Sequence, residues 1–293
     1  MNWLNILIQG ALLGGLYALF AIGLSLSFGI MRLVNIAHGD LIVLSAYLAL
    51  MTIDATGLPP ILSLVVVMPV MSALGYLLQR GLLNFTLGGG LLPPLLVSFG
   101  ISVIIQNLLL EGFGAHTRRL QAGAIETLSL QLGGIAVGVF PTIVFATAVV
   151  AIAGLQLLFY RTALGRAFRA TSDDADTAEL MGVDNRHLYA VAMAIAMIFT
   201  ALAGVLMAIR TTFDPAAGPI RLIFAFEAVI IGGLGSLWGT LVGGIVLGVA
   251  QTVGAQIDVQ YFALSGHVVF LAVLTARAVR SSGALHFLRR VAA

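Results

Sequence analysis

Hydrophobic residues form long runs along this chain, and short polar breaks separate them. The runs cover residues 4–30, 36–53, 59–79, 91–110, 137–160, 188–209, 223–253 and 261–279. An α-helix rises about 1.5 Å per residue, so roughly 20 apolar residues cross the hydrocarbon core of a bilayer. The pattern therefore predicts an all-α polytopic membrane protein with about eight membrane segments.

The run 223–253 is longer than one crossing and has a weak centre. Its middle reads IIGGLGSLWGTLVGG and includes Gly232, Gly233, Gly235 and Ser236. Each glycine costs a helix about 1 kcal/mol relative to alanine. We therefore expect a broken or re-entrant hairpin, and the alternative is one long tilted helix with glycines at a packing face. The glycines of 11–16 (ALLGGL) and 242–248 (VGGIVLG) are expected to mark close contacts between helix backbones.

Composition supports the membrane assignment and excludes several classes of function. The chain of 293 residues is 60% hydrophobic and only 9% charged, whereas soluble domains carry about 25% charged residues. All 14 basic residues are Arg, so a G-x-x-x-x-G-K-[ST] phosphate-binding loop cannot be present; if ATP drives this protein, another chain hydrolyses it. The sequence has no Cys, no metal-ligand spacing and no nucleophile–base arrangement. We therefore expect no enzyme activity, no metal, no cofactor bound by this chain and no nucleic-acid partner.

The arginines orient the chain, because cytoplasmic loops of membrane proteins collect them. With the N-terminus outside, ten arginines face the cytoplasm and four (Arg118, Arg119, Arg210, Arg221) lie outside. The basic C-terminus is then cytoplasmic only if the segment 223–253 returns to the side from which it entered. This requirement independently favours the hairpin.

Charge is concentrated in the stretch 161–187, here named the charged loop, which holds nine of the Arg, Asp and Glu residues. Its first part, from Arg161 to Ala170, is rich in helix formers. We expect Asp173 to cap a second short helix that runs to about Met181, with Asp176 at position N3 and Gly182 ending it. A short capped helix with polar and apolar faces is suited to docking on a partner, and the alternative is an ordinary solvated loop. The candidate docking residues are Arg166, Arg169, Asp173, Asp174, Asp176, Glu179, Leu180, Met181 and Gly182.

Two places put ionisable residues inside apolar runs. Asn35, His38 and Asp40 open the second run, and Glu227 lies in FAFEAVIIGG. Ionisable groups in membrane segments are costly, which by default indicates a pathway or a functional contact. The first three could line a polar conduit, but spacing alone favours a solvated position at the cytoplasmic interface. Glu227 could be interfacial or could face a cavity of the hairpin.

Three stretches carry a resemblance to a known family. Residues 6–48, with FGIM (28–31), VNIAHGD (34–40) and Tyr47, resemble the N-terminal signature of LivH-type permeases of branched-chain amino acid ABC transporters. Residues 165–183 are similar to the family's cytoplasmic segment, and 227–236 to its glycine-rich late segment. The C-terminus departs from the family, because Arg277–Arg280 stand where an Arg-Pro-x-Gly-Leu-Phe-like turn is common.

The resemblance implies a heteromeric importer in the bacterial inner membrane. Its expected partners are two ABC ATPase subunits, a second related permease, a periplasmic substrate-binding protein and the lipid bilayer. Residues 1–280 would form one transmembrane permease domain, with the charged loop as its cytoplasmic coupling element and 281–293 as a basic cytoplasmic tail. The candidate residues of the substrate pathway are Asn35, His38, Asp40, Glu227, Gly232, Gly233, Gly235 and Ser236.

The implied function is import of branched-chain or related small amino acids by a permease subunit that uses ATP hydrolysed on partner chains. One alternative is an importer of the same family for urea, short amides or other small organic acids. A second, from another class, is an ion-coupled secondary transporter in which Asp40 or Glu227 is the coupling acid. The sequence leaves open the exact substrate and whether the permease pair is homo- or heterodimeric.

Overall fold

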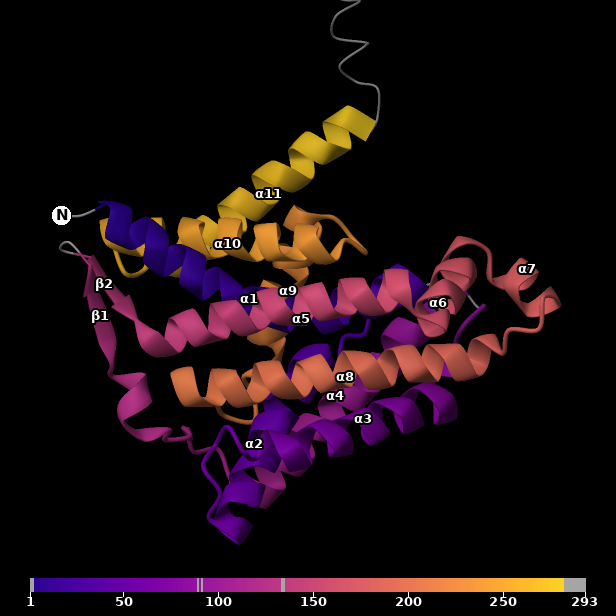
Figure 1. The fold of residues 1–293 in the computed structure, drawn as a ribbon, viewed down its shortest axis with the longest axis horizontal. Coiled ribbons are helices and arrows are strands. Elements are labelled where there is room, and N and C mark those ends of the chain that lie inside the picture. The colour runs from indigo at the N-terminus through magenta and orange to yellow at the C-terminus, as the bar shows by residue number, and fades with distance from the viewer. Residues whose placement is uncertain (1–2, 89, 91, 133–134, 282–293) are drawn as a thin grey trace, which may run out of the picture.

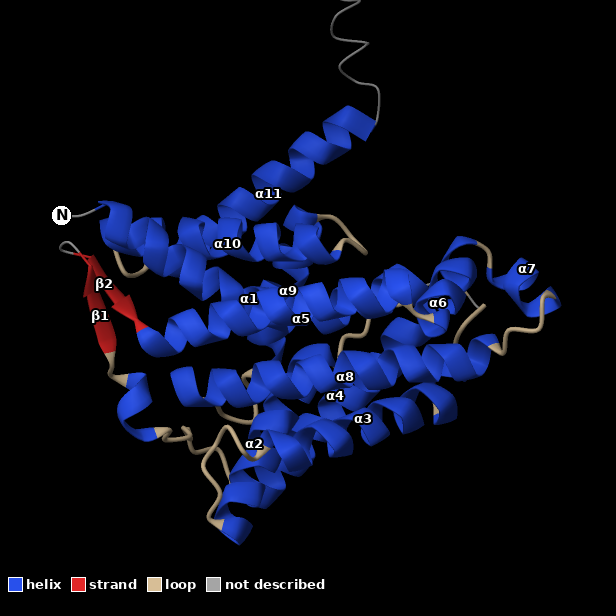
Figure 2. Ribbon diagram, in the orientation of Figure 1, coloured by secondary structure: helices blue, strands red, loops and turns tan. Residues whose placement is uncertain are grey.

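The computed structural model describes residues 3–88, 90, 92–132 and 135–281, and most of them are helical (Figures 1 and 2). The helices are α1 (Trp3–Met31), α2 (His38–Thr56), α3 (Leu64–Gly81), α4 (Leu92–Phe113), α5 (Val139–Arg161), α6 (Ala163–Asp173), α7 (Ala175–Leu180), α8 (Asn185–Arg210), α9 (Gly218–Gly232), α10 (Leu237–Ile257) and α11 (Tyr261–Ser281). Two 3-10 turns, Leu83–Phe85 and Gly123–Glu126, and two strands, β1 (Ser129–Leu132) and β2 (Ile135–Gly138), complete the described elements. Within these residues eight helices are long and apolar enough to cross a membrane, namely α1 to α5, α8, α10 and α11. The expected number of membrane segments is confirmed.

Helices α1 and α8 form the centre of the bundle. About two thirds of the most apolar window of α1 and 72% of that of α8 are buried, against 6% for α11. Glycines allow α1 to approach α10 closely: a Cβ at Gly14 would lie 2.5 Å from the Gly244 carbonyl oxygen, and one at Gly248 would lie 2.3 Å from that of Gly10. The predicted close contacts at ALLGGL and VGGIVLG are therefore confirmed.

The long run 223–253 is broken, as expected. Helices α9 and α10 pack antiparallel, because Cβ atoms at Gly232 and Gly243 would each lie 2.0 Å from the carbonyl oxygens of Gly239 and Ala228 respectively. Gly233 and Gly235 have positive φ in the turn between the helices. The single-helix alternative is wrong, and α9, with 15 residues, is only about 22 Å long.

Two helices begin inside the bundle rather than at its surface. The His38 imidazole at the start of α2 contacts the Phe20 carbonyl oxygen at 2.7 Å, and Phe20 lies about 16 Å back from the end of α1. Gly218, at the start of α9, packs directly on Gly39, whose Cβ would lie 2.0 Å from the Gly218 carbonyl oxygen. The segments 32–37 and 211–217 therefore dip into the bundle from opposite ends.

A small β-hairpin at the N-terminal end of α5 was not expected. Strands β1 and β2 pair antiparallel, with Ser129 opposite Gly138. The sequence SLQLGGIAVG has two residues of glycine between short stretches of alternating polarity, which is a hairpin signal. The hairpin lies in the predicted break between the hydrophobic runs 91–110 and 137–160, and no helix long enough to cross a membrane is described between α4 and α5.

The spans alternate in direction along the chain. In Figure 1 the N-terminus and the β-hairpin lie at one end of the bundle, while α6 and α7 project from the other. The hairpin α9–α10 returns the chain to the end from which it entered, so that α11 runs back toward the end that carries the charged loop. This is the arrangement that the arginine distribution required. The predicted tail 281–293 lies outside the described residues except for Ser281.

We predict that Gly14→Leu loosens the packing of α1 on α10, because the new side chain would overlap the Gly244 backbone. Overpacking of this kind costs about 1–3 kcal/mol. The matched control is Gly154→Leu in α5, since a Cβ at Gly154 meets nothing within 4 Å. Thermal unfolding in detergent should show a clear loss for the first variant and little change for the second. Equal stability of the two variants would contradict the proposed contact.

Candidate functional site

The first candidate site is the place where the start of α2 meets the start of α9. Asn35, His38 and Asp40 are buried there, with exposed fractions of 4%, 1% and 1%. The solvated-interface interpretation of these three residues is therefore wrong. The conduit interpretation remains a prediction.

Asn35 and His38 fix the backbone that leads into α2. The Asn35 side-chain oxygen accepts a hydrogen bond from the Ala37 N–H at 3.0 Å, and its carbonyl accepts one from the His38 N–H at 3.2 Å. The His38 Nε2 lies 2.7 Å from the Phe20 carbonyl, which can only accept, so Nε2 carries the proton. Asn35 thus fixes the turn into α2, and His38 attaches the start of α2 to the middle of α1.

Asp40 connects three helices. Its Oδ2 accepts a hydrogen bond from the Ser102 hydroxyl of α4 at 2.6 Å, and Ser102 in turn accepts one from Gln106 at 3.2 Å. Its Oδ1 has no hydrogen-bond partner among the described residues and lies against Gly218, where a Cβ would come within 1.9 Å. Asp40 is in the first turn of α2 and beside the first residue of α9, where helix dipoles favour a negative charge.

Beyond Gln106 the polar connection reaches a small pocket of about 150 Å³. The pocket is lined by Gln106, Asn107, Leu110, Ala115, Asp214, Pro215 and Ala216. A row of polar groups thus runs from the pocket to the buried carboxylate, which is the arrangement that a polar conduit requires.

Glu227 belongs to a different face of α9. It lies nine residues after Gly218, and nine steps of 100° place its side chain half a turn away from the face that contacts α2. Its carboxylate pairs with the His267 imidazole of α11 at 2.5 Å, and Glu227 is only 3% exposed. The structure therefore does not bring Glu227 together with Asp40, and Glu227 is not interfacial. The pairing joins residues 40 positions apart on separate helices, so no local sequence signal could have revealed it.

The glycine-rich turn forms the second part of the candidate pathway. Ser236 caps α10 by accepting a hydrogen bond from the Gly239 N–H at 3.1 Å. Gly235 lies against Gly29 of α1, at 3.2 Å for a Cβ placed on Gly29. Arg277 of α11 donates to the Ile231 carbonyl at 2.8 Å and so holds the end of α9. Arg277 was noted in the sequence only as a departure from the family's C-terminal turn.

The charged loop packs against the end of α1, beside this turn. The Ser172 hydroxyl of α6 donates to the Gly29 carbonyl at 2.7 Å. Arg169 donates to the Phe159 carbonyl and lies over the Tyr160 ring, 5.1 Å from its centre. A cavity of about 480 Å³ lies between α1, α5, α6 and the turn. Its lining includes Ser25, Gly29, Gln156, Arg169, Ser172, Gly235, Ser236 and Trp238.

The short helices of the charged loop are both capped, but one cap differs from the prediction. Thr162 caps α6 by accepting from the Gly165 N–H at 3.0 Å. Asp174, not Asp173, caps α7: its Oδ1 accepts from the N–H groups of Asp176 and Thr177, each at 3.1 Å. Asp173 instead ends α6, because α6 continues past Ala170. Asp176 is consequently at N2, one position earlier in the helix than expected.

Gly182 ends the unit as predicted. It has φ +89°, its N–H donates to the Glu179 carbonyl, and the N–H of Val183 donates to that of Ala178. This pair of bonds is the Schellman pattern, which favours glycine at the left-handed position.

Helix α7 presents an apolar tip to its surroundings. Leu180 is 88% exposed and Met181 82% exposed, and the acidic residues Asp173, Asp174, Asp176 and Glu179 are also exposed, as are Arg166 and Gly182. Asn185 holds α7 in place by donating to the Ala175 carbonyl at 2.7 Å, and the Thr171 hydroxyl of α6 donates to Asn185 at 3.0 Å. Arg169 alone of the predicted docking residues turns inward, to the Phe159 carbonyl.

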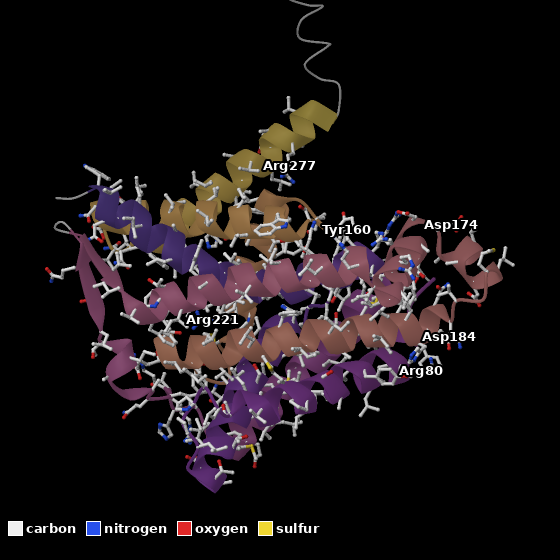
Figure 3. The ribbon with its side chains drawn as sticks, in the orientation of Figure 1. Arg80, Tyr160, Asp174, Asp184, Arg221 and Arg277 are labelled. Atoms are coloured by element: carbon white, nitrogen blue, oxygen red, sulfur yellow. The ribbon has the colours of Figure 1, made fainter. Side chains whose placement is uncertain are left out.

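The carboxylates at the two helix starts of this region are held in their charged form. Hydrogen bonds from the Thr177 hydroxyl and N–H lower the pKa of Asp174. The N–H of His187 lowers the pKa of Asp184, which caps α8 and lies 3.7 Å from Arg80 (Figure 3). Both carboxylates are therefore charged at neutral pH, and both stabilise helix ends.

Asp174→Ala should expose α7 to solvent exchange, because the N–H groups of Asp176 and Thr177 lose their acceptor. Hydrogen–deuterium exchange of the purified protein should be several-fold faster over 175–181. Because the folded-state pKa of Asp174 is lowered, wild-type protection should hold above pH 4 and fall as the pH drops through that lowered pKa. Asp173→Ala is the matched control and should exchange like the wild type. Equal exchange in both variants would show that Asp174 is not the cap.

Comparison with known proteins places this geometry in a family. The model of the family described as "Branched-chain amino acid transport system / permease component" matches residues 6–276. The chain is 29% identical over 268 residues to the high-affinity branched-chain amino acid transport system permease protein BraD of Pseudomonas aeruginosa, covering 87% of each chain. It is 26% identical over 292 residues to LivH, the permease protein of the same kind from Escherichia coli, covering 94% of this chain and 93% of LivH. A fructose import permease protein, FrcC of Rhizobium meliloti, is 29% identical over 229 residues, which are 74% of this chain and 61% of FrcC. No solved structure matches the chain.

Proposed function

This chain belongs to the family of branched-chain amino acid transport system permease components, and from this we propose its function. We propose that it is the membrane-spanning permease subunit of an ATP-driven importer for branched-chain or related small amino acids. The observation that carries this proposal is the family match over nearly the whole chain, residues 6–276. The capped, exposed helix α7 supports it, because such an importer needs a surface on which a separate ATPase can dock.

The ATPase partners would dock on the tip of α7. Leu180 and Met181 form an apolar tip beside exposed carboxylates. This tip suits a groove with an apolar floor and a basic rim on one of the two ABC ATPase subunits. The bonds from Asn185 and Thr171 hold α7 on α6 and α8, so movement of the tip would move α6 as well. The absence of Lys from the chain agrees with ATP being used on partner chains only.

Movement of α6 would reach the membrane helices through Gly29. Ser172 bonds the Gly29 carbonyl, and Gly235 of the α9–α10 turn lies on the same residue. A displacement of α6 would therefore act on α1 and on the turn together. In this way ATP binding and hydrolysis would drive rocking of the bundle between outward- and inward-facing states.

The orientation follows from the side on which the ATPases work. The end that carries α6, α7, Arg80 and Asp184 (Figure 3) would be cytoplasmic, and the N-terminus and β-hairpin would face the periplasm across the bacterial inner membrane. The periplasmic substrate-binding protein would dock at the end with the β-hairpin. The second permease, related to this chain, would cover part of the bundle surface on which α5 and α11 leave most of their length unburied.

Two other functions remain distinguishable. The fructose permease among the relatives carries a different cargo, so import of urea, short amides or other small organic acids by the same machinery is the nearest alternative. An ion-coupled secondary transporter would use Asp40 or Glu227 as the coupling acid. A secondary transporter has no ATPase, so this second alternative leaves the exposed apolar tip of α7 without a function.

The direct test is uptake of radiolabelled L-leucine into proteoliposomes. We expect uptake only when the chain is reconstituted with its ATPases, its partner permease and its binding protein, and only with ATP inside the vesicle. Uptake by the chain alone under a proton or sodium gradient would contradict the proposal and establish the secondary transporter. ATP-dependent uptake of urea or an amide, without uptake of leucine, would change the assigned substrate class and leave the assignment as an ATP-driven permease unchanged.

Leu180→Asp combined with Met181→Asp should remove ATPase binding and ATP-dependent uptake, because the apolar tip of α7 would become charged. The matched control is Val259→Asp, which changes an exposed apolar residue, 81% accessible, in the α10–α11 connection at the opposite end. Co-purification of the ATPases and the amount of permease in the membrane should be measured together. If the double variant retains its ATPases, the coupling role of α7 is wrong.

A further inference from the structure

Two arginines lie inside the outer half of the bundle, where the sequence analysis had placed them outside the membrane. Arg221 is in the first turn of α9, which begins at the depth of Gly39. In Figure 3 it lies in projection between the ribbons of α5 and α8. Arg210, the last residue of α8, reaches the Leu12 carbonyl at 3.5 Å, and Leu12 lies about 14 Å along α1 from Trp3. Both residues are only partly exposed.

Neither arginine has an acidic partner among the residues that the structure describes. Their hydrogen bonds are long, 3.5 Å to the Leu12 carbonyl and 3.4 Å from Arg221 to the Thr212 carbonyl. The Arg221 Nε is buried without a partner. The ion pairs of the described chain are Arg80–Asp184, Arg119–Glu126 and His267–Glu227.

The neighbouring acids are already engaged elsewhere. Asp214 lies close enough to Arg221 to act on it electrostatically, but its Oδ1 accepts the Ala216 N–H at 2.9 Å. Asp40 accepts from Ser102 on the α2 side of α9, and Glu227 pairs with His267 on the α11 side. Asp214 therefore offsets part of the charge of Arg221 without forming an ion pair with it, and no described acid pairs with Arg210.

The two arginines approach one point beside α1. Arg221 reaches the carbonyl of Thr212, two residues after Arg210. Arg210 reaches the carbonyl of Leu12, five residues before Tyr17. The Tyr17 hydroxyl donates to the Gln251 side chain of α10. The rings of Tyr17 and Phe224, 5.1 Å apart, give this point an apolar wall. An unpaired guanidinium at such depth is costly, which indicates a functional contact.

We infer that Arg210 and Arg221 bind the carboxylate of the cargo as it passes through the outer half of the bundle. The guanidinium fork matches a carboxylate in two parallel hydrogen bonds, and the Tyr17–Phe224 wall suits an apolar cargo side chain. This inference rests on the proposed function, since it takes an amino acid as the cargo. A phospholipid phosphate shares the same anion chemistry and is the alternative source to be separated by experiment.

The test uses the whole reconstituted transporter and measures the maximal rate of L-leucine uptake for Arg210→Gln and Arg221→Gln. Loss of a charge-assisted hydrogen bond should lower this rate about tenfold to a hundredfold in each variant. The KM for leucine-loaded binding protein should change little, because the binding protein docks outside. Arg221→Lys and Arg210→Lys keep the charge without the fork and should recover part of the rate. Arg119→Gln changes an exposed arginine at the same end that donates to the Ile209 carbonyl and pairs with Glu126. It should transport like the wild type, because Arg119 already has an acidic partner.

Three outcomes would overturn the inference. The first is a wild-type rate in both Gln variants, provided that the complex assembles. The second is a Lys variant that transports as slowly as its Gln counterpart while both variants fail to fold or to assemble into the complex. This result would show that the arginines have a structural role only. The third is a difference that disappears in vesicles of purely zwitterionic phosphatidylcholine and returns when anionic phosphatidylglycerol is added, because the bound anion would then be a lipid headgroup.

A failure of the proposed function gives a different result. In that case the wild-type transporter itself does not import leucine. The carboxylate site is then judged by thermal unfolding of the purified chain with acetate or with acetamide. Stabilisation by acetate alone, absent in Arg210→Gln and Arg221→Gln, would support the site, and equal stabilisation by both compounds would contradict it.

Discussion

The structure depends on starting two helices, α2 and α9, inside an apolar bundle. The first N–H groups of a helix have no intrahelical partner, and the interior offers no bulk water to satisfy them. Asn35 turns the backbone into α2 by accepting the Ala37 N–H, and a proline in the first turn of α9 removes one donor. The Asp40 carboxylate lies beside both helix starts, and it can do so only because position 218 has no Cβ, which would lie 1.9 Å from Oδ1. One buried carboxyl group and the glycines at positions 39 and 218 thus allow α2 and α9 to start side by side inside the bundle.

The opposite end of α9 is held in a different way. Its last carbonyl groups meet Arg277 of α11, and a turn with two glycines at positive φ joins it to α10. The same turn touches Gly29, which also accepts the Ser172 hydroxyl from α6. The polar interactions of the charged loop, the end of α1 and the break in the α9–α10 hairpin therefore meet at one place. A short packed helix that is held at both ends by a few polar contacts is the kind of element that can shift as a rigid body.

Local signals in the sequence predicted much of this arrangement. The spans follow from the length of the apolar runs, the break at Gly232–Ser236 from helix-weakening glycines, and the end of α7 from Gly182. Depth and pairing could not be predicted: a run of apolar residues does not reveal that α2 starts in the middle of the bundle, so Asn35, His38 and Asp40 were expected to be solvated. The observed cap of α7 is Asp174, whereas the prediction was Asp173, because either aspartate satisfies the local capping pattern. The Glu227–His267 pair and the deep position of Arg221 depend on which helices are neighbours, and one sequence carries no record of that.

Helix α9 is contacted on opposite faces by groups that are costly to separate. One face lies on Asp40 and Gly39 of α2, and the other places Glu227 against His267 of α11. Since a buried carboxylate that loses its partner is strongly destabilising, α9 cannot drift gradually between α2 and α11. It can only keep both contacts, moving with its neighbours, or exchange one complete set of contacts for another. Packed interiors favour such discrete alternatives over continuous deformation, and the rocking mechanism that we propose requires two discrete states of α9.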